Sequence, residues 1–245
     1  MNPALTVVIP AYNESRRLGR ALDRLDVFLT AREGASDIIV IDDGSTDATA
    51  DLVRQRIGAR IDLQLLVNPE NRGKGYCVRR GMLEARGDLI LMTDADLSCP
   101  IEEIDKLLPH LDRGFDVVIG SRDMPESKLD PPQPLSRRLM ARCLRLFRRR
   151  LFLPQIRDTQ CGFKLFRREV AQEVFQRLTI DGWLFDCEAL ALADRLGYRI
   201  QEVGVTWRND PDSRVHPLRE PFRVLTDLLR IRRHLAATRS VRPNP

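Results

Sequence analysis

The chain has 245 residues, of which 43% are hydrophobic and 31% are charged, and its formal net charge at pH 7 is +5. This length and apolar content predict one domain with a substantial buried core. The five scattered cysteines form neither a CxxC pair nor a Cys/His spacing, which argues for reduced thiols and against a zinc site. The positive charge favours phosphorylated substrates or an anionic membrane surface as partners. Nucleic acid is disfavoured because aromatic residues are only 6% and no binding motif is present.

The first 122 residues alternate apolar runs of strand length with segments of helical spacing. The predicted strands are residues 5–9, 38–41, 63–67, 89–92 and 117–119. Each run is nearly continuous, which is typical of parallel strands covered by helices on both faces. We therefore predict an α/β fold with a mostly parallel sheet and helices on both faces.

Several predicted strands end in a polar cluster, at residues 11–14, 42–45, 94–96 and 120–122. The carboxyl ends of parallel strands meet at one edge of the sheet, where open α/β sheets bind their ligands. We expect the four clusters to be neighbours there and to form the active site.

Asp94 and Asp96 form the most informative of these clusters. In an extended chain the two carboxylates point to the same side, with their Cα atoms about 7 Å apart. Such a pair can share Mg²⁺ or Mn²⁺, with phosphate oxygens of a substrate completing the coordination. The alternative is a purely structural role, in which Asp94 is a turn residue and Asp96 the N-cap of the next helix. For residues 94–96 taken alone, this alternative is favoured.

Two further clusters surround glycines. Asp42 and Asp43 suit neutral donors such as ribose hydroxyls, and residues 45–47 look like an N-cap that opens the next helix. Residues 71–75 place two glycines and Lys74 before a helix predicted for residues 76–85, so that backbone N–H groups and a cation could face phosphate. Each cluster alone is also compatible with an ordinary turn.

The second half of the chain has a different pattern. It contains an Arg-rich helical segment at residues 135–152, a short apolar piece at 163–166, two helices, a strand near 199–207 and a basic helix at roughly 221–237. The first segment has apolar residues at i+4 spacing and seven arginines on other faces, so it either lies on anionic lipid or is an ordinary surface helix.

Taken in order, residues 7–14 (VVIPAYNE), 42–47 (DDGSTD), 71–75 (NRGKG) and 94–96 (DAD) resemble the family 2 glycosyltransferases of GT-A fold. The resemblance continues through residues 120–122, 157–166 and 183–188 and covers nearly the whole chain. The stretch 157–166 resembles the dolichyl-phosphate β-glucosyltransferase branch and, after it, the dolichol-phosphate mannosyltransferases.

The resemblance implies one compact GT-A domain, in which residues 1–122 bind the nucleotide sugar and residues 123–245 form an acceptor half with basic amphipathic helices. The implied activity is inverting transfer of a hexose, with glucose favoured, from a nucleotide diphosphate sugar to a polyprenyl phosphate, either dolichyl or undecaprenyl. UDP-glucose is the favoured donor, GDP-mannose is possible, and Mg²⁺ or Mn²⁺ is the implied cofactor.

The same resemblance assigns site residues. Asp94 and Asp96 would bind the metal and Arg122 the acceptor phosphate, so that Asp96 and Arg122 are the expected catalytic residues. Relatives among the mannosyltransferases usually have Gln two positions after the second Asp, where this chain has Ser98, so a third protein ligand is not identified. The nucleotide pocket would be lined by Pro10, Tyr12, Glu14, Asp43 and Lys74, and Arg137 or Arg138 would assist Arg122.

A phosphate monoester is already anionic at pH 7 and needs no general base to attack a sugar carbon. A family 2 enzyme acting on a sugar hydroxyl would need one, and Asp186 or Glu188 is then the candidate, although both also suit the first turn of a helix. A third possibility is a non-catalytic, nucleotide-binding adaptor at a membrane surface. The sequence shows neither a secretory signal nor a run of roughly 20 apolar residues, so we expect a cytoplasmic protein, peripheral on the cytoplasmic face of a membrane.

Overall fold

In the computed structural model, the described residues are 4–58, 62–130, 153–208 and 221–238. The strands are β1 (Leu5–Ala11), β2 (Ser36–Asp42), β3 (Asp62–Val67), β4 (Leu89–Met92), β5 (Val117–Ser121), β6 (Lys128–Asp130), β7 (Lys164–Arg167), β8 (Ile200–Gly204) and β9 (Thr206–Arg208). The helices are α1 (Leu18–Thr30), α2 (Thr49–Arg54), α3 (Lys74–Glu84), η1 (Ile101–Glu103, a 3-10 helix), α4 (Ile104–Asp112), α6 (Arg168–Arg177), α7 (Phe185–Arg195) and α8 (Pro221–Ala237).

The large sheet has seven strands in the order β3-β2-β1-β4-β7-β5-β8, and β6 and β9 form a separate pair. In the large sheet β7 runs antiparallel to both of its neighbours, and every other pairing is parallel. The predicted α/β fold with a mostly parallel sheet is therefore confirmed. Because β7 and β8 come from the second half of the chain, the two halves share one sheet, and a functional division at residue 122 stays a prediction.

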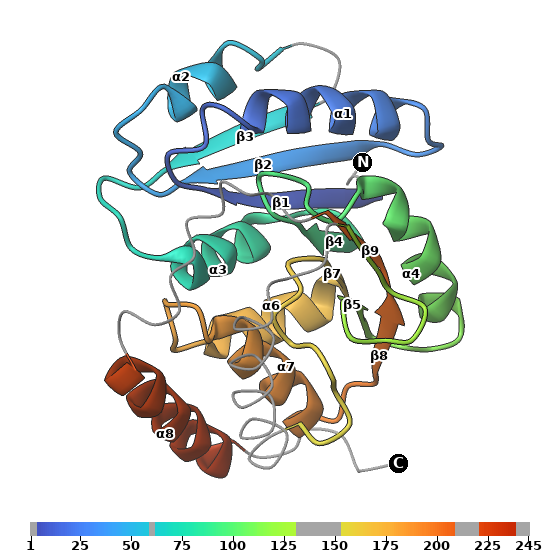
Figure 1. The fold of residues 1–245 in the computed structure, drawn as a ribbon, viewed down its shortest axis with the longest axis vertical. Coiled ribbons are helices and arrows are strands. Elements are labelled where there is room, and N and C mark those ends of the chain that lie inside the picture. Colours follow the sequence, from blue (N-terminus) through green and yellow to red (C-terminus); the bar gives the residue numbers. More distant parts are fainter. Residues whose placement is uncertain (1–3, 59–61, 131–152, 209–220, 239–245) are drawn as a thin grey trace.

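Helices cover both faces of the large sheet, with α1, α2 and α4 on one side and α3, α6 and α7 on the other (Figure 1). Successive side chains of β1 alternate between the two layers: Val7 and Ile9 pack with residues of α1 and α4, whereas Val8 packs with residues of α3. All three are fully buried. This double burial is the physical reason why the strand sequences are continuously apolar.

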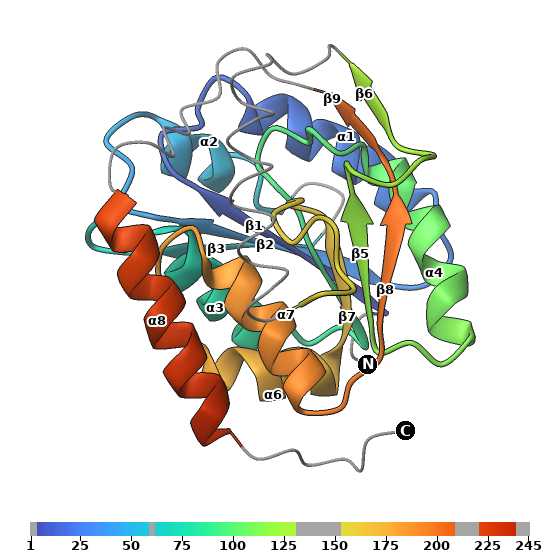
Figure 2. The same cartoon turned by 60° about the horizontal axis from the view of Figure 1, so that its bottom comes forward.

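The antiparallel strand β7 determines what reaches the edge of the sheet where the parallel strands end. Lys164, its first residue, is opposite Met92 of β4 and Ile119 of β5, near the carboxyl ends of those strands. The segment that precedes β7, residues 157–163, therefore arrives between the ends of β4 and β5. Figure 2 shows β7 beside β5 and β8, with β9 and β6 beyond the end of β8.

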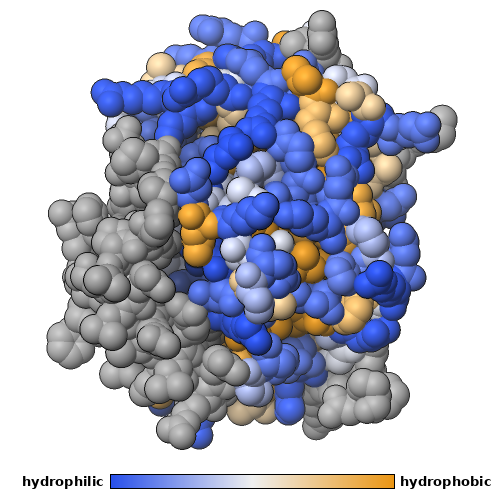
Figure 3. All heavy atoms as spheres, turned by 45° about the vertical axis from the view of Figure 1, so that its right-hand side comes forward, coloured by the Kyte–Doolittle hydropathy of each residue, from blue (hydrophilic) through white to orange (hydrophobic). Residues whose placement is uncertain are grey.

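Helix α8 packs against α7 at the side of the domain (Figure 2). Leu228 and Ile231 are buried, whereas Arg230, Arg232 and Arg233 are exposed. On the face drawn in Figure 3, the described side chains are mostly hydrophilic and the apolar ones lie in small separate groups. Among the helices of the described ranges, none combines the length and the apolar character needed to cross a bilayer. The Arg-rich segment 135–152, with Arg137 and Arg138, lies outside the described residues.

Candidate active site

The polar clusters that follow β1, β2 and β4 are neighbours, as expected. The backbone N–H of Asp43 donates to Ala11 O over 2.8 Å, and that of Thr93 donates to Val8 O over 3.0 Å. The ends of β2 and β4 therefore flank the end of β1. This juxtaposition creates one polar edge from residues that are far apart in the sequence.

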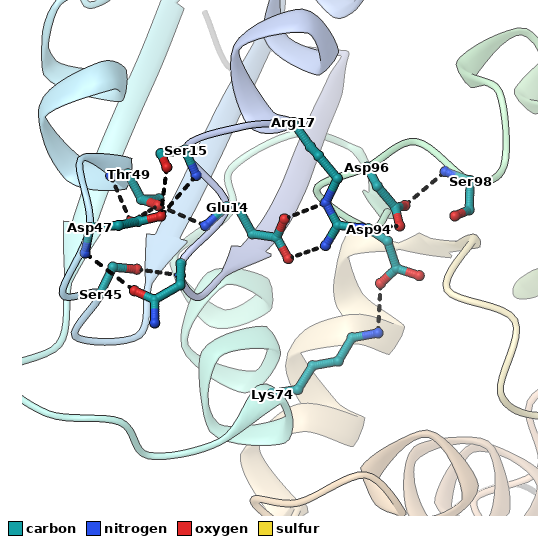
Figure 4. A network of polar contacts seen from close by, with 11 residues as sticks. Glu14, Ser15, Arg17, Ser45, Asp47, Thr49, Lys74, Asp94, Asp96 and Ser98 are labelled. Carbon is teal, nitrogen blue, oxygen red and sulfur yellow. Dashed lines mark hydrogen bonds and ion pairs between the residues drawn. The ribbon is translucent and has the colours of Figure 1, made fainter. Parts of the chain in front are cut away.

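The loops after β1 and β2 are joined by hydrogen bonds from their own side chains (Figure 4). The N–H of Asn13 donates to Ser45 Oγ, and the N–H of Glu14 donates to Thr49 Oγ1, both over 2.8 Å. Asn13 has a φ of +56°, a left-handed conformation that Asn tolerates better than most residues. The expected helix opening at residues 45–47 is partly confirmed: the cap position of α2 is Ala48, but Asp47 accepts the N–H of Thr49, the first helical residue, over 3.0 Å. Ser45 instead helps to orient Asn13.

Asp43 holds the loop that precedes α3. Its carboxylate accepts the backbone N–H groups of Arg72 (2.9 Å) and Gly73 (2.8 Å) and the side-chain amide of Asn68 (2.8 Å), and the residue is 4% exposed. Asp43 thus fixes the position of this loop, and its expected contact with a nucleotide stays a prediction. Of the other nucleotide-pocket candidates, Tyr12 is exposed and Pro10 is half-buried in β1.

Lys74 begins α3, two residues earlier than the predicted helix start. Its Nζ lies 2.6 Å from Asp94 Oδ1 and 5.2 Å from the centre of the exposed Trp183 ring. Burial alone would lower the pKa of Lys74, but Asp94 and Asp186 more than offset this effect, so its pKa is raised and the side chain stays charged. A fixed cation therefore stands beside one of the two predicted metal ligands.

The expectation that the backbone of this loop faces phosphate is wrong for the N–H groups described. Gly73 N–H donates to Asp43, and Gly75 N–H donates to Asp181 O over 2.8 Å. These donors are occupied within the protein, and Lys74 is the cation of this loop that lies beside the acidic pair. The glycines are required for another reason: a Cβ at Gly73 or at Gly75 would lie 2.6 Å from a backbone carbonyl oxygen of the segment 180–181.

Arg17, which sequence reasoning did not single out, lies between Glu14 and Asp96 (Figure 4). Its guanidinium makes two bonds to the Glu14 carboxylate, of 2.8 and 2.7 Å, and its Nη1 lies 3.5 Å from Asp96 Oδ2. Only the spacing of Arg17 from Glu14, three residues along the chain, could have suggested this pair. Glu14 is thereby held at the same edge as the metal-ligand candidates.

Asp94 and Asp96 lie close enough to repel each other. Burial, and then the charge of Asp94, raises the pKa of Asp96, and the Ser98 N–H and Arg17 only partly oppose this. Asp96 does not cap a helix, because the cap residue of η1 is Pro100; its Oδ1 accepts the Ser98 N–H over 2.8 Å. Directly after the second acid, Leu97 has a φ of +48°, a strained value of the kind that concentrates at functional sites.

The two carboxylates fit a divalent cation. A shared cation would relieve the repulsion that raises the pKa of Asp96, and oxygen ligands are those that Mg²⁺ and Mn²⁺ prefer. In the described part of the chain, no group of three or more His, Cys, Asp or Glu side chains is placed to hold a metal. The remaining ligands would therefore come from a bound diphosphate or water rather than from further acidic side chains.

Arg122, at the end of β5, is bound by Asp158. Its Nε and Nη2 lie 2.7 and 2.9 Å from the two carboxylate oxygens, and its backbone N–H donates to the same group over 3.1 Å. Burial would raise the pKa of Asp158, but the Arg122 charge outweighs it and the pKa is well below its usual range. The guanidinium also lies 5.0 Å from the centre of the Trp207 ring. Arg122 is thus a rigidly held cation, with 23% of its side chain exposed.

The two candidate bases for a hydroxyl acceptor are both buried and occupied. Asp186 Oδ1 accepts Lys164 Nζ over 2.5 Å, and the Glu188 carboxylate accepts bonds from Thr179, Ile180 and His234. Burial raises the pKa of Asp186 despite the nearby charges of Lys164 and Lys74. Both acids lie in the first turn of α7, as the structural alternative predicted, and neither is exposed beyond 2%.

The chain matches the family model described as Glycosyl transferase family 2 over residues 6–175. It is similar to the protein named dolichyl-phosphate beta-glucosyltransferase of Dictyostelium discoideum, with 37% identity over 243 residues that cover 94% of this chain and 74% of that protein. A Homo sapiens protein of the same name is 33% identical over 242 residues, covering 93% of this chain and 74% of the relative.

Solved structures with a similar fold include glucosyl-3-phosphoglycerate synthase from Mycobacterium tuberculosis with Mn²⁺, UDP-glucose and phosphoglyceric acid, with a TM-score of 0.65, 19% identity and coverage of 97% of this chain and 81% of that chain. Mannosyl-3-phosphoglycerate synthase from Rubrobacter xylanophilus has a TM-score of 0.68 and 19% identity, covering 98% and 77%. At these identities the likeness shows the fold alone, and that fold is the GT-A fold. The family match over more than half of its length and the similarity to these relatives show that this chain belongs to glycosyl transferase family 2.

Proposed function

We propose that the protein transfers glucose from UDP-glucose to a polyprenyl phosphate with inversion at the anomeric carbon, using Mg²⁺ or Mn²⁺. GDP-mannose is the alternative donor. The observation that carries the proposal is that one edge of the sheet holds two cationic side chains. Lys74 lies at the acidic pair and contacts Asp94, and Arg122 lies on the other side of the segment that enters β7. The names of the relatives, dolichyl-phosphate beta-glucosyltransferase, support the same substrates.

On the donor side, each residue has a separate task. The Lys74 ammonium, which stays protonated, would balance charge on the diphosphate as the sugar leaves. A divalent cation, when bound by Asp94 and Asp96, supplies further neutralisation of the leaving group. Glu14 and Tyr12, in the loop after β1, would contact the nucleoside. The Arg17 pair with Glu14 holds this loop against the acidic pair.

On the acceptor side, Arg122 would bind the phosphate monoester. The guanidinium is oriented before substrate arrives, because Asp158 uses its Nε and Nη2. A preoriented cation lowers the cost of bringing two anionic substrates together and lining them up for attack. Arg137 or Arg138 would assist. No residue is asked to remove a proton, which agrees with the burial of Asp186 and Glu188.

The acceptor proposed here is a lipid, so the protein must approach a membrane. We propose that it does so peripherally, from the cytoplasmic side, through basic helices. The exposed arginines of α8, Arg230, Arg232 and Arg233, support this because clusters of basic residues attract anionic headgroups. Leu229 is 47% exposed on the same helix and can insert at the headgroup boundary.

The test offers radiolabelled UDP-glucose and GDP-mannose separately to the protein with polyprenyl phosphate and Mn²⁺, and measures label that enters the organic phase. Label from UDP-glucose is the expected result. Label from GDP-mannose alone would correct the donor, and absence of transfer from both would refute the lipid acceptor.

The same preparation separates the two alternatives. Transfer of label to a soluble sugar but not to lipid would support a hydroxyl acceptor. The structure leaves that reaction without its candidate base, since Asp186 and Glu188 are both occupied. Nucleotide binding that does not depend on Mn²⁺, together with absent transfer to any acceptor, would support the adaptor.

A further inference from the structure

Two buried glutamates each hold a loop at the active edge by accepting two consecutive backbone N–H groups. Glu188 on α7 is 0% exposed and accepts the N–H groups of Thr179 (2.9 Å) and Ile180 (2.8 Å). Glu202 on β8 is 7% exposed and accepts those of Arg157 (2.8 Å) and Asp158 (2.7 Å). One of these glutamates therefore acts behind each proposed cationic residue, in the way that Asp43 holds the N–H groups of Arg72 and Gly73.

Every carboxylate oxygen of Glu188 is occupied. Besides the two backbone donors, it accepts the Thr179 hydroxyl over 2.7 Å and lies 2.8 Å from His234 Nδ1 of α8. Four contacts on a fully buried side chain leave it no freedom to take another rotamer without leaving buried donors unpaired. The segment that begins at Thr179 is accordingly tied to both α7 and α8.

That segment in turn holds the start of α3. The carbonyl oxygen of Asp181 accepts the N–H groups of Gly75 (2.8 Å) and Tyr76 (3.3 Å). The fit is close, since a Cβ at Gly73 would lie 2.6 Å from Asp181 O and one at Gly75 would lie 2.6 Å from Ile180 O. Lys74, between these glycines, is therefore held from two sides: residues 180–181 hold the α3 side, and Asp43 holds the loop before it.

On the other side of the site, Glu202 acts through Asp158. The two N–H bonds from residues 157–158 orient the Asp158 backbone, and the Asp158 carboxylate makes three hydrogen bonds to Arg122. Neither chain of contacts passes through the other glutamate. A disturbance at Glu202 should therefore reach Arg122 without reaching Lys74.

We infer that Glu188 and Glu202 are positioning residues with separate targets: Glu188 places Lys74 for the donor diphosphate, and Glu202 places Arg122 for the acceptor phosphate. The ligands named in this inference rest on the proposed function, but the two mechanical connections do not. The inference gives α7 and β8, to which no substrate contact is assigned, a part in placing the two cations.

The first experiment measures backbone hydrogen exchange in the ligand-free protein and its variants. Glu188→Leu has no acceptor atom, so the N–H groups of Thr179 and Ile180 lose their partner, and exchange should become at least about tenfold faster at residues 75–76 and 179–180. Exchange at residues 157–160 should stay unchanged. Glu202→Gln should give the opposite pattern.

Should Glu188→Leu fail to fold, Thr179→Val removes the hydroxyl donor to Glu188 with little change in shape, and Thr179→Ser retains it as the conservative rescue. Glu202→Asp, which keeps the charge but shortens the reach, serves in the same way for the second site. Glu173→Gln is the matched control: Glu173 of α6 accepts bonds from Tyr198 and Arg177 and has no contact with either loop.

The second experiment compares Mn²⁺-dependent UDP binding with KM for the acceptor. Glu188→Leu should weaken UDP binding by about tenfold and leave the acceptor KM within about twofold, and Glu202→Gln should do the reverse. Unchanged exchange at residues 75–76 in Glu188→Leu, or equal changes in both loops from either variant, would overturn the inference. Separate exchange patterns in a protein that binds no UDP would uphold the positioning roles and refute the proposed function instead.

Discussion

Gly162 lies directly against the carboxylate of Asp94: a Cβ atom at position 162 would stand 2.0 Å from Asp94 Oδ2 and 2.5 Å from Asp94 Cγ. The contact joins the segment before β7 to the turn after β4. It exists because β7 runs antiparallel and starts beside the carboxyl ends of its neighbours. Gly162 is therefore part of the structure that places a proposed metal ligand.

Gly162→Ala is expected to abolish Mn²⁺-dependent nucleotide binding although both carboxylates remain. The added methyl group must displace Asp94, which is held by Lys74, and crowding of this kind costs about 1–3 kcal/mol of folding free energy. The check is calorimetric UDP titration with Mn²⁺, alongside thermal unfolding. Gly19→Ala, whose nearest neighbour is the flexible end of Arg56, is the control and should bind as the wild type does. Wild-type binding by Gly162→Ala would show that Asp94 need not stay in place.

Asp96→Asn is expected to lower kcat/KM by at least about 100-fold. Asp96 would bind the metal directly, and loss of residues that only hydrogen-bond to metal ligands already costs roughly 10- to 100-fold in metal affinity. The metal-free variant should unfold at a temperature no lower than the wild type. The reason is that burial and Asp94 raise the pKa of Asp96, so its charge costs stability at neutral pH. Asp88→Asn, at the other end of β4 and 70% exposed, is the matched control. Wild-type turnover by Asp96→Asn would remove it from the site.

Arg122→Ala should raise the acceptor KM by about 10- to 100-fold, which corresponds to a charge-assisted hydrogen bond of roughly 1.5–3 kcal/mol. UDP affinity should change little, because Lys74 and the acidic pair are not touched. Lys74→Ala provides the converse, with weaker UDP binding and a nearly unchanged acceptor KM. Steady-state kinetics with each substrate varied, together with UDP titration, measure both. Equal losses for donor and acceptor in Arg122→Ala would contradict its assignment.

Asp158→Asn should reduce the free energy of unfolding at pH 7 by about 3 kcal/mol, because it leaves the Arg122 charge without its buried partner. The folded pKa of Asp158 is lowered from its ordinary value of 3.8. The stability that the Asp158 carboxylate contributes is therefore fully present above pH 3.8 and is lost as the pH falls from 3.8 toward the folded pKa. The gap between wild type and Asp158→Asn should stay constant from pH 8 to about 5 and narrow below 3.8, as measured by urea unfolding across this range. A gap that is the same at pH 3 and pH 7 would show that the pair does not titrate as described.

Local sequence was sufficient for the strands and for much of the polar edge. A strand that is buried on both faces is continuously apolar whichever strands lie beside it. The runs that form β1 to β5 could therefore be recognised from the sequence alone. The clusters after β1, β2 and β4 followed, because parallel strands necessarily end at the same side. Asp94 and Asp96 could be named for the same reason, since their spacing and their place after a strand are local properties.

Tertiary structure alone decided what surrounds them. The sequence does not state that β7 inserts antiparallel between β4 and β5, and only that choice brings Gly162 to Asp94 and Asp158 to Arg122. It likewise does not reveal that the carbonyl of Asp181 accepts the N–H groups of Gly75 and Tyr76 at the α3 start, where the glycine spacing had suggested a phosphate. These contacts join residues tens of positions apart, and their energies depend on burial and on the pairing of polar groups. Such terms have no local periodicity, so they appear only once the chain has folded.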